Sequence, residues 1–128
     1  MKKSPQLFLL LLIALLTTVG FMVKLPRVFH NIDKELHALY YLFAYIAATF
    51  LYPRTLILSA IGLVLFGICI EFSQEFSNKI TYHYMGRAIH GRFDIIDVKY
   101  NAVGIGVGII CRTIERIIGN VLNIKVVR

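Results

Sequence analysis

Three short groups of ionisable and amide side chains recur along this sequence, each beside a run of apolar residues. The groups are Asp33, Lys34 and His37; Glu71, Gln74 and Glu75; and Arg92, Asp94, Asp97 and Asn101. Within each group, spacings of three or four residues place the side chains on one face of a helix. Carboxylates and an imidazole that converge can exchange protons, hold a cation or an amine, or orient a polar headgroup. The sequence therefore contains the side chains of a binding or acid–base site, provided that the fold brings the groups together.

Four apolar runs lie beside these groups and must position them. The runs cover about 7–23, 36–52, 55–72 and 95–111. A helix that crosses a bilayer needs roughly 17–25 predominantly apolar residues, and each run is long enough. We therefore predict an all-α membrane protein with a single domain over residues 1–128. The expected fold is a four-transmembrane-helix bundle with a C-terminal amphipathic helical extension at 112–125, which either continues the fourth span or lies in the interface.

The composition favours a membrane protein over a soluble one. Of the 128 residues, 58% are apolar and 16% are charged, and the mean hydropathy is +0.72. A soluble domain has about 45–50% apolar and about 25% charged residues. The net charge of +7 comes from basic residues that flank the apolar runs, as anionic lipid and the positive-inside bias favour. No basic stripe with interleaved aromatic residues occurs on a polar segment, so we exclude nucleic acid as a partner.

The connections between the runs follow from local signals. Two lysines before the first run resemble a secretory signal, but no convincing small-x-small cleavage site follows, so we predict an uncleaved first helix. Asp33 is placed to cap the second helix. Pro53 predicts a tight hinge between the second and third spans, because proline disfavours a helical conformation in the residue before it. A polar loop is predicted from 73 to 93.

In any four-span arrangement, the three polar groups face the same membrane surface. The start of the second span, the end of the third and the start of the fourth all lie on one side. The 14 basic residues divide equally between the two sides, and acidic residues contribute little to topology. Because most acidic residues lie with the polar groups, we predict both termini in the cytoplasm and the polar groups at the outer face.

We predict that one cavity, open to the outer leaflet, gathers His37, Glu71, Asp94 and Asp97. Charged side chains are costly in lipid, so they face the interior of a bundle and pair there. The acids outnumber the basic groups available inside this cavity, and at least one carboxyl is therefore expected to stay protonated or to hold an exogenous cation or amine. The alternative is structural, because helix ends need caps, interfaces are commonly charged, and His37 can simply bond to Glu71 or Tyr41.

Residues in the fourth run indicate how the helices pack. Asn101 lies two turns inside this run and needs a partner from a neighbouring helix. Gln74 or Glu71, at the end of the third span, is the nearest candidate by depth. Gly104 and Gly108 form a small-xxx-small face, which favours close approach of two helices.

The remaining cysteines and histidines carry no predicted site. Cys69 and Cys111 are expected at different depths, beyond disulfide reach, and we predict that they are packing residues. His83 and His90 lie in the predicted loop 73–93 without metal-ligand spacing, and we predict that they are solvated. We predict no metal site and no cofactor.

Taken in order, the polar groups resemble the VanZ-like family of small bacterial membrane proteins. The matching elements are Asp33-Lys34-x-x-His37, Glu71-x-x-Gln74 and Arg92-Phe93-Asp94-x-x-Asp97-x-x-x-Asn101-x-x-Gly104. The resemblance covers about 33–108, with each element at the expected helix end. The arginine stands closer to Asp94 than in many relatives, so Arg87 could take the place of Arg92. The binding residues expected from the pattern are Asp33, Lys34, His37, Glu71, Gln74, Arg92, Asp94, Asp97 and Asn101.

The resemblance implies a multi-pass protein of the cytoplasmic (inner) membrane of a bacterium. It also implies action at the cell envelope, because the family's namesake is associated with resistance to the glycopeptide teicoplanin. We expect the polar groups to bind a lipid or glycolipid headgroup, with Lys34, Arg87 or Arg92 meeting phosphate. The expected partners are membrane lipids, a lipid-linked envelope precursor or other membrane proteins. Two alternatives stay open: a membrane enzyme on a lipid-linked substrate, with His37 or Glu71 as general base, and a structural subunit of a larger membrane complex.

Overall fold

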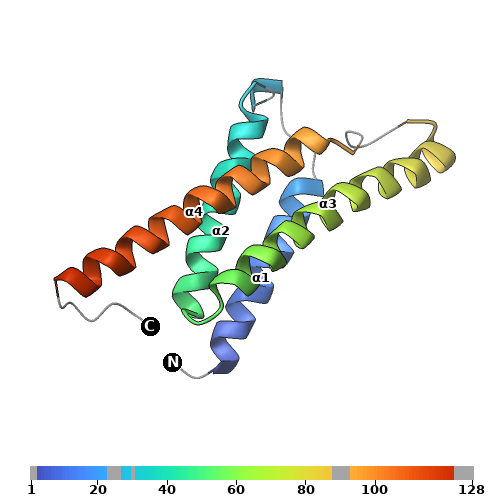
Figure 1. Ribbon diagram of the computed structural model, residues 1–128. Coiled ribbons are helices and arrows are strands. Elements are labelled where there is room, and N and C mark those ends of the chain that lie inside the picture. The colour runs from blue at the N-terminus through green and yellow to red at the C-terminus, as the bar shows by residue number, and fades with distance from the viewer. Residues whose placement is uncertain (1–2, 23–26, 30, 88–92, 123–128) are drawn as a thin grey trace.

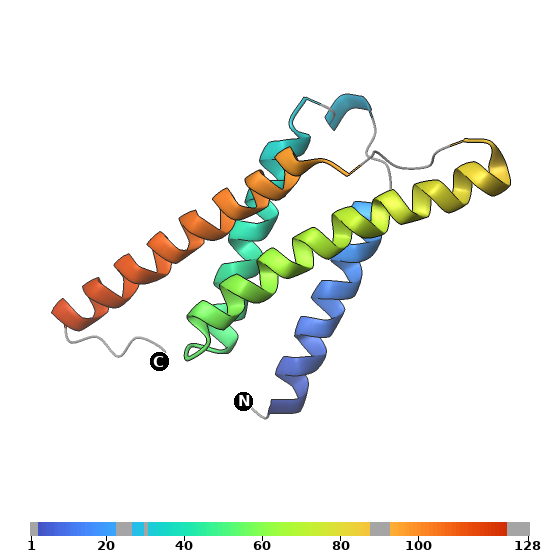
Figure 2. The ribbon, with the colours of Figure 1, turned by 45° about the vertical axis from the view of Figure 1, so that its right-hand side comes forward.

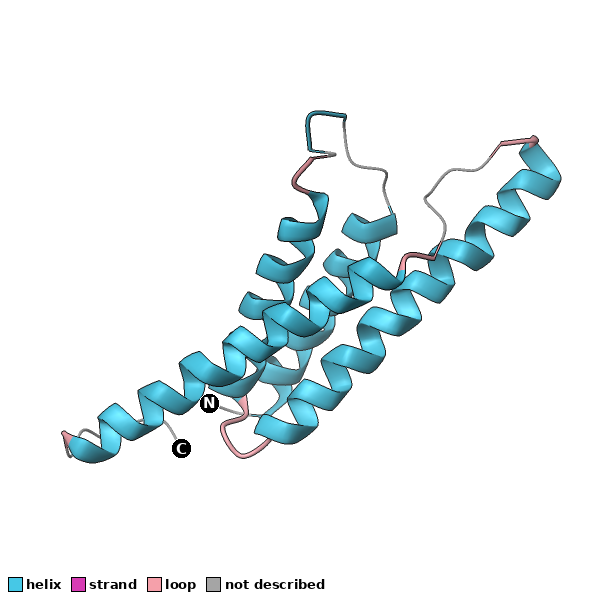
Figure 3. Cartoon of the chain, turned by 45° about the horizontal axis from the view of Figure 1, so that its top comes forward, coloured by secondary structure: helices cyan, strands magenta, loops and turns pink. Residues whose placement is uncertain are grey.

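The computed structural model describes residues 3–22, 27–29, 31–87 and 93–122, and these residues form helices and loops without a strand (Figures 1 and 3). The elements in chain order are α1 (Lys3–Met22), the short 3₁₀ helix η1 (Arg27–Phe29), α2 (Asp33–Leu51), α3 (Leu56–Met85) and α4 (Ile95–Val121). The predicted all-α class with four long helices is confirmed. The start of α1, the α2–α3 turn and the end of α4 lie at one end of the molecule, and the starts of α2 and α4 lie at the other (Figures 1 and 2).

α2 and α3 form the antiparallel hairpin that the proline predicted. Tyr52 still donates its backbone N–H to the carbonyl of Ala48 at 2.9 Å. Pro53 then stops α2, because the residue before a proline avoids the helical conformation. The hydroxyl of Thr55 donates to the Tyr52 carbonyl at 2.8 Å and closes the turn. Arg116 of α4 donates to the Pro53 carbonyl, so the turn is also tied to α4.

α2 and α4 share the most extensive contact between the described helices. A Cβ atom on Gly104 would overlap the backbone carbonyl of Ala38, and a Cβ atom on Gly108 would lie 2.7 Å from Cδ1 of Tyr45. Glycine at these two positions therefore lets the helices approach more closely than any larger residue would. The predicted small-xxx-small face is confirmed. Gly106, which lies between the two, faces open space.

α1 packs against the bundle through polar as well as aromatic contacts. The hydroxyls of Thr17 and Tyr40 are hydrogen-bonded to each other. Gln74 of α3 donates from Nε2 to the backbone carbonyl of Phe21 at 2.8 Å. The Phe21 ring lies with its centroid 4.5 Å from that of His37. The first apolar run is therefore an integral part of the helical bundle.

α3 is longer than the sequence predicted. A polar loop was expected from 73 to 93, but α3 continues to Met85, so this prediction is wrong over 73–85. The hydroxyls of Ser73 and Thr81 bond back to the carbonyls four residues earlier. Such polar side chains are satisfied without leaving the helix. The helix ends at Gly86, whose φ of 67° is the left-handed conformation that terminates many helices.

The other helix boundaries also refine the sequence predictions. Asp33 is the first residue of α2 and not its N-cap, so the predicted cap is wrong. The N-cap position belongs to Ile32, whose side chain makes no capping hydrogen bond. Asp33 still lies in the first turn, where a carboxylate is favoured by the helix dipole. α4 runs without a break to Val121, so the predicted extension at 112–125 continues the fourth helix, and its residues from 123 onward lie outside the described residues.

The two cysteines lie on the outside of the bundle. Cys69 and Cys111 are both free and both exposed. The expectation that they pack inside is therefore wrong, since depth along a helix does not determine which face a residue occupies. Because both thiols are free, they must be replaced in any cysteine-based experiment.

The outward faces of the helices are strongly apolar. Exposed side chains include Phe8, Leu16, Phe43, Ile57, Phe72, Ile110 and Ile117. By length and composition, one described helix, α3, is long and apolar enough to cross a membrane, and the apolar stretch Pro5–Phe21 of α1 is shorter. α2 and α4 both carry acidic residues in their first turns, and these residues lower the mean hydropathy of the two helices. Composition therefore supports one membrane-crossing helix and gives weak evidence for membrane association.

Replacing Gly104 by alanine should push α2 and α4 apart, because the new methyl group would overlap the Ala38 carbonyl. Overpacking of this kind costs about 1–3 kcal/mol, so the midpoint of thermal unfolding in detergent should fall by several degrees. Gly106→Ala is the matched control. It adds the same methyl group to open space and should leave the midpoint unchanged or slightly raised, because alanine favours the helix. Equal midpoints for the two variants would contradict the close contact.

Candidate functional site

The starts of α2 and α4 meet beside the middle of α3 (Figure 2). Seven polar side chains gather there, and we call them the polar cluster: Asp33, Lys34, His37, Glu71, Asp94, Asp97 and Asn101. They come from three helices because α2 and α4 both begin at this end and α3 passes it at mid-length. The structure thus brings together most of the side chains that the sequence grouped by helix spacing and topology.

His37 and Asn101 form the centre of the polar cluster. They are 5% and 3% exposed, and His37 Nδ1 lies 3.1 Å from Asn101 Oδ1. Because an amide oxygen only accepts hydrogen bonds, His37 donates from Nδ1, and in the neutral imidazole Nε2 carries the lone pair. Nε2 faces Asp33, whose Oδ1 lies 4.0 Å away. Asn101 also packs against α3, since a Cβ atom on Gly67 would lie 2.9 Å from its Nδ2.

Glu71 is 1% exposed and is the most deeply buried carboxylate of the polar cluster. Its Oε2 accepts a hydrogen bond from the backbone N–H of Asp94 at 3.1 Å. Its Oε1 has no hydrogen-bond partner within the described part of the chain, and neither has the buried Oδ1 of Asp97. Glu71 interacts electrostatically with Asp97 and His37. An unsatisfied buried acceptor costs about 1–3 kcal/mol, so a donor or cation from outside the chain would be stabilised here.

The rim of the polar cluster is held by ion pairs and helix capping. Asp94 is the N-cap of α4 and accepts a hydrogen bond from the N–H of Ile96 at 2.8 Å, as capping aspartates do. Its other oxygen lies 3.7 Å from Nζ of Lys34, and both of these side chains are more than a third exposed. Glu75 accepts a hydrogen bond from the backbone N–H of Phe93 at 2.9 Å. The segment that leads into α4 is therefore fastened to α3.

Within the polar cluster, carboxylates outnumber lysines. The four carboxylates Asp33, Glu71, Asp94 and Asp97 accompany one lysine, Lys34. An excess of buried or half-buried negative charge favours a cation, an amine or hydroxyl groups over a bare anion. The site is therefore suited to positively charged or hydroxyl-bearing ligands, with a basic group at its rim.

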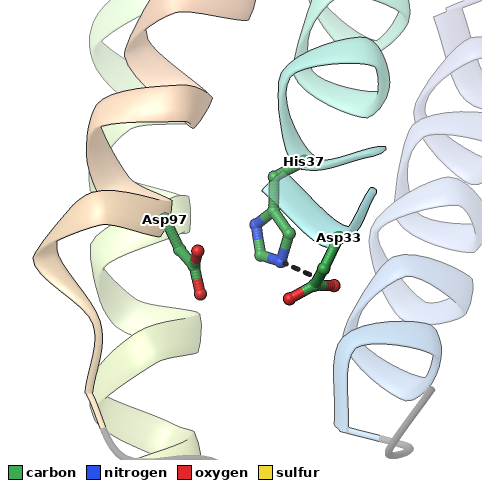
Figure 4. A group of neighbouring side chains, drawn as sticks. All are labelled: Asp33, His37 and Asp97. Carbon is green, nitrogen blue, oxygen red and sulfur yellow. Dashed lines mark ion pairs between the residues drawn. The ribbon is translucent and has the colours of Figure 1, made fainter. Parts of the chain in front are cut away.

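Three residues on two helices also have the arrangement of potential metal ligands. Asp33 and His37 on α2 and Asp97 on α4 point toward one another (Figure 4). Their potential ligand atoms all lie within 4.8 Å of one another. The prediction of no metal set overlooked this trio. The four-residue spacing of Asp33 and His37 was the part of this arrangement that the sequence could show. Asp97 comes from α4, whose rotation about its axis the sequence does not reveal.

Some predicted site residues lie elsewhere. Gln74 donates to the backbone of Phe21 in α1 and is not part of the polar cluster. Arg92 lies outside the described residues. Arg87, the alternative arginine, is exposed beyond the end of α3. His83 is exposed as predicted, but on α3 and not in a loop, while His90 lies outside the described residues.

The hydrogen-bond partners of the buried histidine and asparagine differ from those predicted. Asn101 packs against α3 as predicted, but it bonds to His37 of α2 and not to Gln74 or Glu71. Likewise His37 bonds to Asn101 and not to Glu71 or Tyr41. The predicted depth of Asn101 relative to α3 was adequate, but the polar face of α4 turns toward α2. Sequence reasoning also missed Phe21, which covers the His37 ring.

The chain matches no family model, and no curated protein or solved structure matches it. The resemblance to the VanZ-like family therefore depends on the three motifs of the sequence alone. The geometry of the polar cluster is the basis for any inference about function.

Replacing Asn101 by leucine should leave the buried N–H of His37 without an acceptor, at a cost of about 1–3 kcal/mol. Adding His37→Phe removes the unsatisfied donor and keeps a ring against Phe21, so the double variant should regain part of the loss. A double-mutant cycle of unfolding free energies in mixed micelles should show a coupling of about 0.5–3 kcal/mol. Strictly additive losses would mean that the two side chains do not interact.

Proposed function

We propose that this chain is an integral protein of the bacterial cytoplasmic membrane that crosses the bilayer four times and binds an envelope lipid or glycolipid headgroup through the polar cluster. The observation that carries the proposal is an inverted polarity. Among the described residues, the buried polar side chains are Thr17, His37, Thr49, Glu71, Asn78, Asn101 and Arg112, whereas the buried hydrophobic ones are Tyr41, Tyr45, Ile70 and Ile105. A soluble domain buries mainly apolar residues. A bundle in lipid exposes them and pairs its polar groups inside.

The direction of the helices supports four crossings. Each long helix runs opposite to its predecessor, with the start of α1, the α2–α3 turn and the end of α4 at one end (Figure 1). The charged first turns of α2 and α4 lie at the other end, where spans would meet headgroups. Arg112, near the end of α4, is 3% exposed and donates to the exposed Glu115 and to the Thr49 carbonyl of α2. The exposed charged residues of α2 and α4 are Glu35, Lys99 and Glu115. Each lies within about two turns of a helix end, where a span would meet headgroups.

The chemistry of the polar cluster supports a headgroup as the ligand. The unpartnered oxygens of Glu71 and Asp97 can accept hydrogen bonds from an amine or from sugar hydroxyls. Lys34 on the rim can meet a phosphate, with Arg87 or Arg92 in the connection to α4 as a second base. A headgroup that combines phosphate with amine or hydroxyl groups can bond both to the carboxylate oxygens and to the basic side chains. The VanZ-like motifs support action at the cell envelope, in a role resembling teicoplanin-type resistance.

Cysteine labelling tests the four-span topology. In a variant in which Cys69 and Cys111 are replaced by serine, single cysteines at Glu35 and Arg87 should react with an impermeant maleimide added to intact cells. A cysteine at Arg54, in the α2–α3 turn, should react only after the membrane is opened. Reaction of Glu35→Cys and Arg87→Cys from opposite compartments would overturn the topology. If Arg54→Cys reacts in intact cells and Glu35→Cys and Arg87→Cys react only after the membrane is opened, the four-span topology holds but the orientation is the reverse of the proposed one.

Substituting Glu71→Gln tests headgroup binding, because it keeps the shape and removes the charge. Hydrogen bonds to charged groups contribute about 1.5–3 kcal/mol, so retention of envelope lipid should fall by roughly tenfold or more. Native mass spectrometry of the protein, purified after exposure to a total bacterial lipid extract, measures this retention. Glu35→Gln is the matched control, since Glu35 is exposed in the first turn of α2 and should retain lipid as the wild type does.

The same pair of variants has a cellular readout. In a bacterium made less susceptible to teicoplanin by the wild-type chain, Glu71→Gln should restore susceptibility at equal membrane expression, and Glu35→Gln should not. A Glu71→Gln protein that no longer folds would favour a structural network. Wild-type lipid retention and phenotype in Glu71→Gln would exclude the polar cluster as the headgroup site.

A further inference from the structure

Asp33, His37 and Asp97 converge at a separation that suits a bound ion better than a direct contact. Nε2 of His37 and Oδ1 of Asp33 are 4.0 Å apart, which is beyond hydrogen-bond reach. Bonds of about 2.0–2.2 Å to one ion place two ligand atoms about 3–4 Å apart. All three residues offer a ligand atom within 4.8 Å of the other two (Figure 4). We propose that Asp33, His37 and Asp97 bind a divalent transition-metal cation such as zinc.

The His37 imidazole is already in the form that a metal requires. Asn101 Oδ1, at 3.1 Å from Nδ1, accepts the hydrogen bond from that nitrogen and so leaves the lone pair on Nε2. Histidine ligands commonly donate their other N–H to an oxygen in this manner, which fixes both the tautomer and the ring orientation. Phe21 covers the ring with a centroid distance of 4.5 Å. His37 is therefore fixed with the lone pair of Nε2 toward Asp33.

Unpartnered buried oxygens provide an independent sign of a missing positive charge. Asp97 Oδ1 and Glu71 Oε1 are buried and have no hydrogen-bond partner within the described part of the chain. Glu71 is 1% exposed and close enough to His37 and Asp97 to interact with them electrostatically. The nearby base Lys34 pairs with Asp94 at the rim. A divalent cation between Asp33, His37 and Asp97 would balance the two negative charges of the aspartates and would also attract the carboxylate of Glu71.

The ligand types select the class of metal. Calcium and magnesium prefer oxygen ligands alone, whereas one imidazole with two carboxylates suits zinc, manganese or iron. Three protein ligands leave at least one position for water or for an oxygen of a ligand. The two supporting helices are locked together by the Gly104 contact with Ala38, so the ligands are arranged before the ion arrives. Metal binding does not require that a headgroup bind.

The test uses the full chain, purified in detergent, stripped of metal and titrated with zinc against a chromophoric chelator. One equivalent should bind per chain. Asp33→Asn and Asp97→Asn should each lower the affinity by roughly tenfold to a hundredfold or more. Cobalt in place of zinc should give visible absorption bands that each of these variants weakens. Circular dichroism and gel filtration should show that both variants fold as the wild type does, since Asp33 and Asp97 are only half-buried.

Matched controls separate this site from adventitious binding. Glu35→Gln removes an exposed carboxylate from the same turn as Asp33, and His83→Gln removes an exposed imidazole from α3. Both should bind one equivalent with wild-type affinity. Absence of stoichiometric binding would overturn the proposal. So would zinc binding that His83→Gln weakens and that Asp33→Asn and Asp97→Asn leave intact.

Discussion

At Gly104 the backbone of α4 passes against the carbonyl of Ala38 at a distance that no side chain would allow. The polar contacts between α2 and α4 lie on both sides of this point. Toward the helix starts, His37 reaches Asn101, and toward the far end Arg112 reaches a backbone carbonyl of α2. Short side chains such as asparagine span only a small gap, so the spacing of the two helices decides whether these bonds can form. The glycine contact thus sets the geometry of the polar contacts between α2 and α4.

The buried polar groups of the bundle bond mainly to neighbouring helices. Thr17 bonds to Tyr40 and Gln74 bonds to the backbone of Phe21, so α1 is joined to α2 and α3 by polar groups. In surroundings of low dielectric such bonds are strengthened, and a missing partner is costly. Most buried groups with described contacts use neighbouring helices. Among the described residues, the buried side-chain atoms without a hydrogen-bond partner are Glu71 Oε1, Asp97 Oδ1 and Arg112 Nε. The two oxygens lie together in the polar cluster, which is why the structure points to a ligand there.

Much of the fold follows from the sequence, because apolar runs and Pro53 act locally. The helix number, the hairpin and the close face of Gly104 and Gly108 needed no knowledge of tertiary packing. The end of α3 did not follow, since Ser73 and later polar residues bond to their own helix and are not confined to loops. For the site, topology placed the right residues at one end. Rotation of α4 about its axis decided that Asn101 meets His37, and spacing along one chain segment contains no information about that rotation.

α3 has 30 residues and is therefore about 45 Å long at 1.5 Å per residue, whereas the hydrocarbon core of a bilayer is about 30 Å thick. Tyr82, Tyr84 and Met85 are exposed near its end, and tyrosines are favoured at the boundary between lipid and water. In the proposed membrane, α3 must tilt or rise through the headgroup layer. Glu71, at mid-helix, accepts a hydrogen bond from the backbone at the start of α4, so it lies at the level where that helix begins. The half of α3 beyond Glu71 would therefore stand in the headgroup layer or above it, beside any lipid headgroup that approaches the polar cluster.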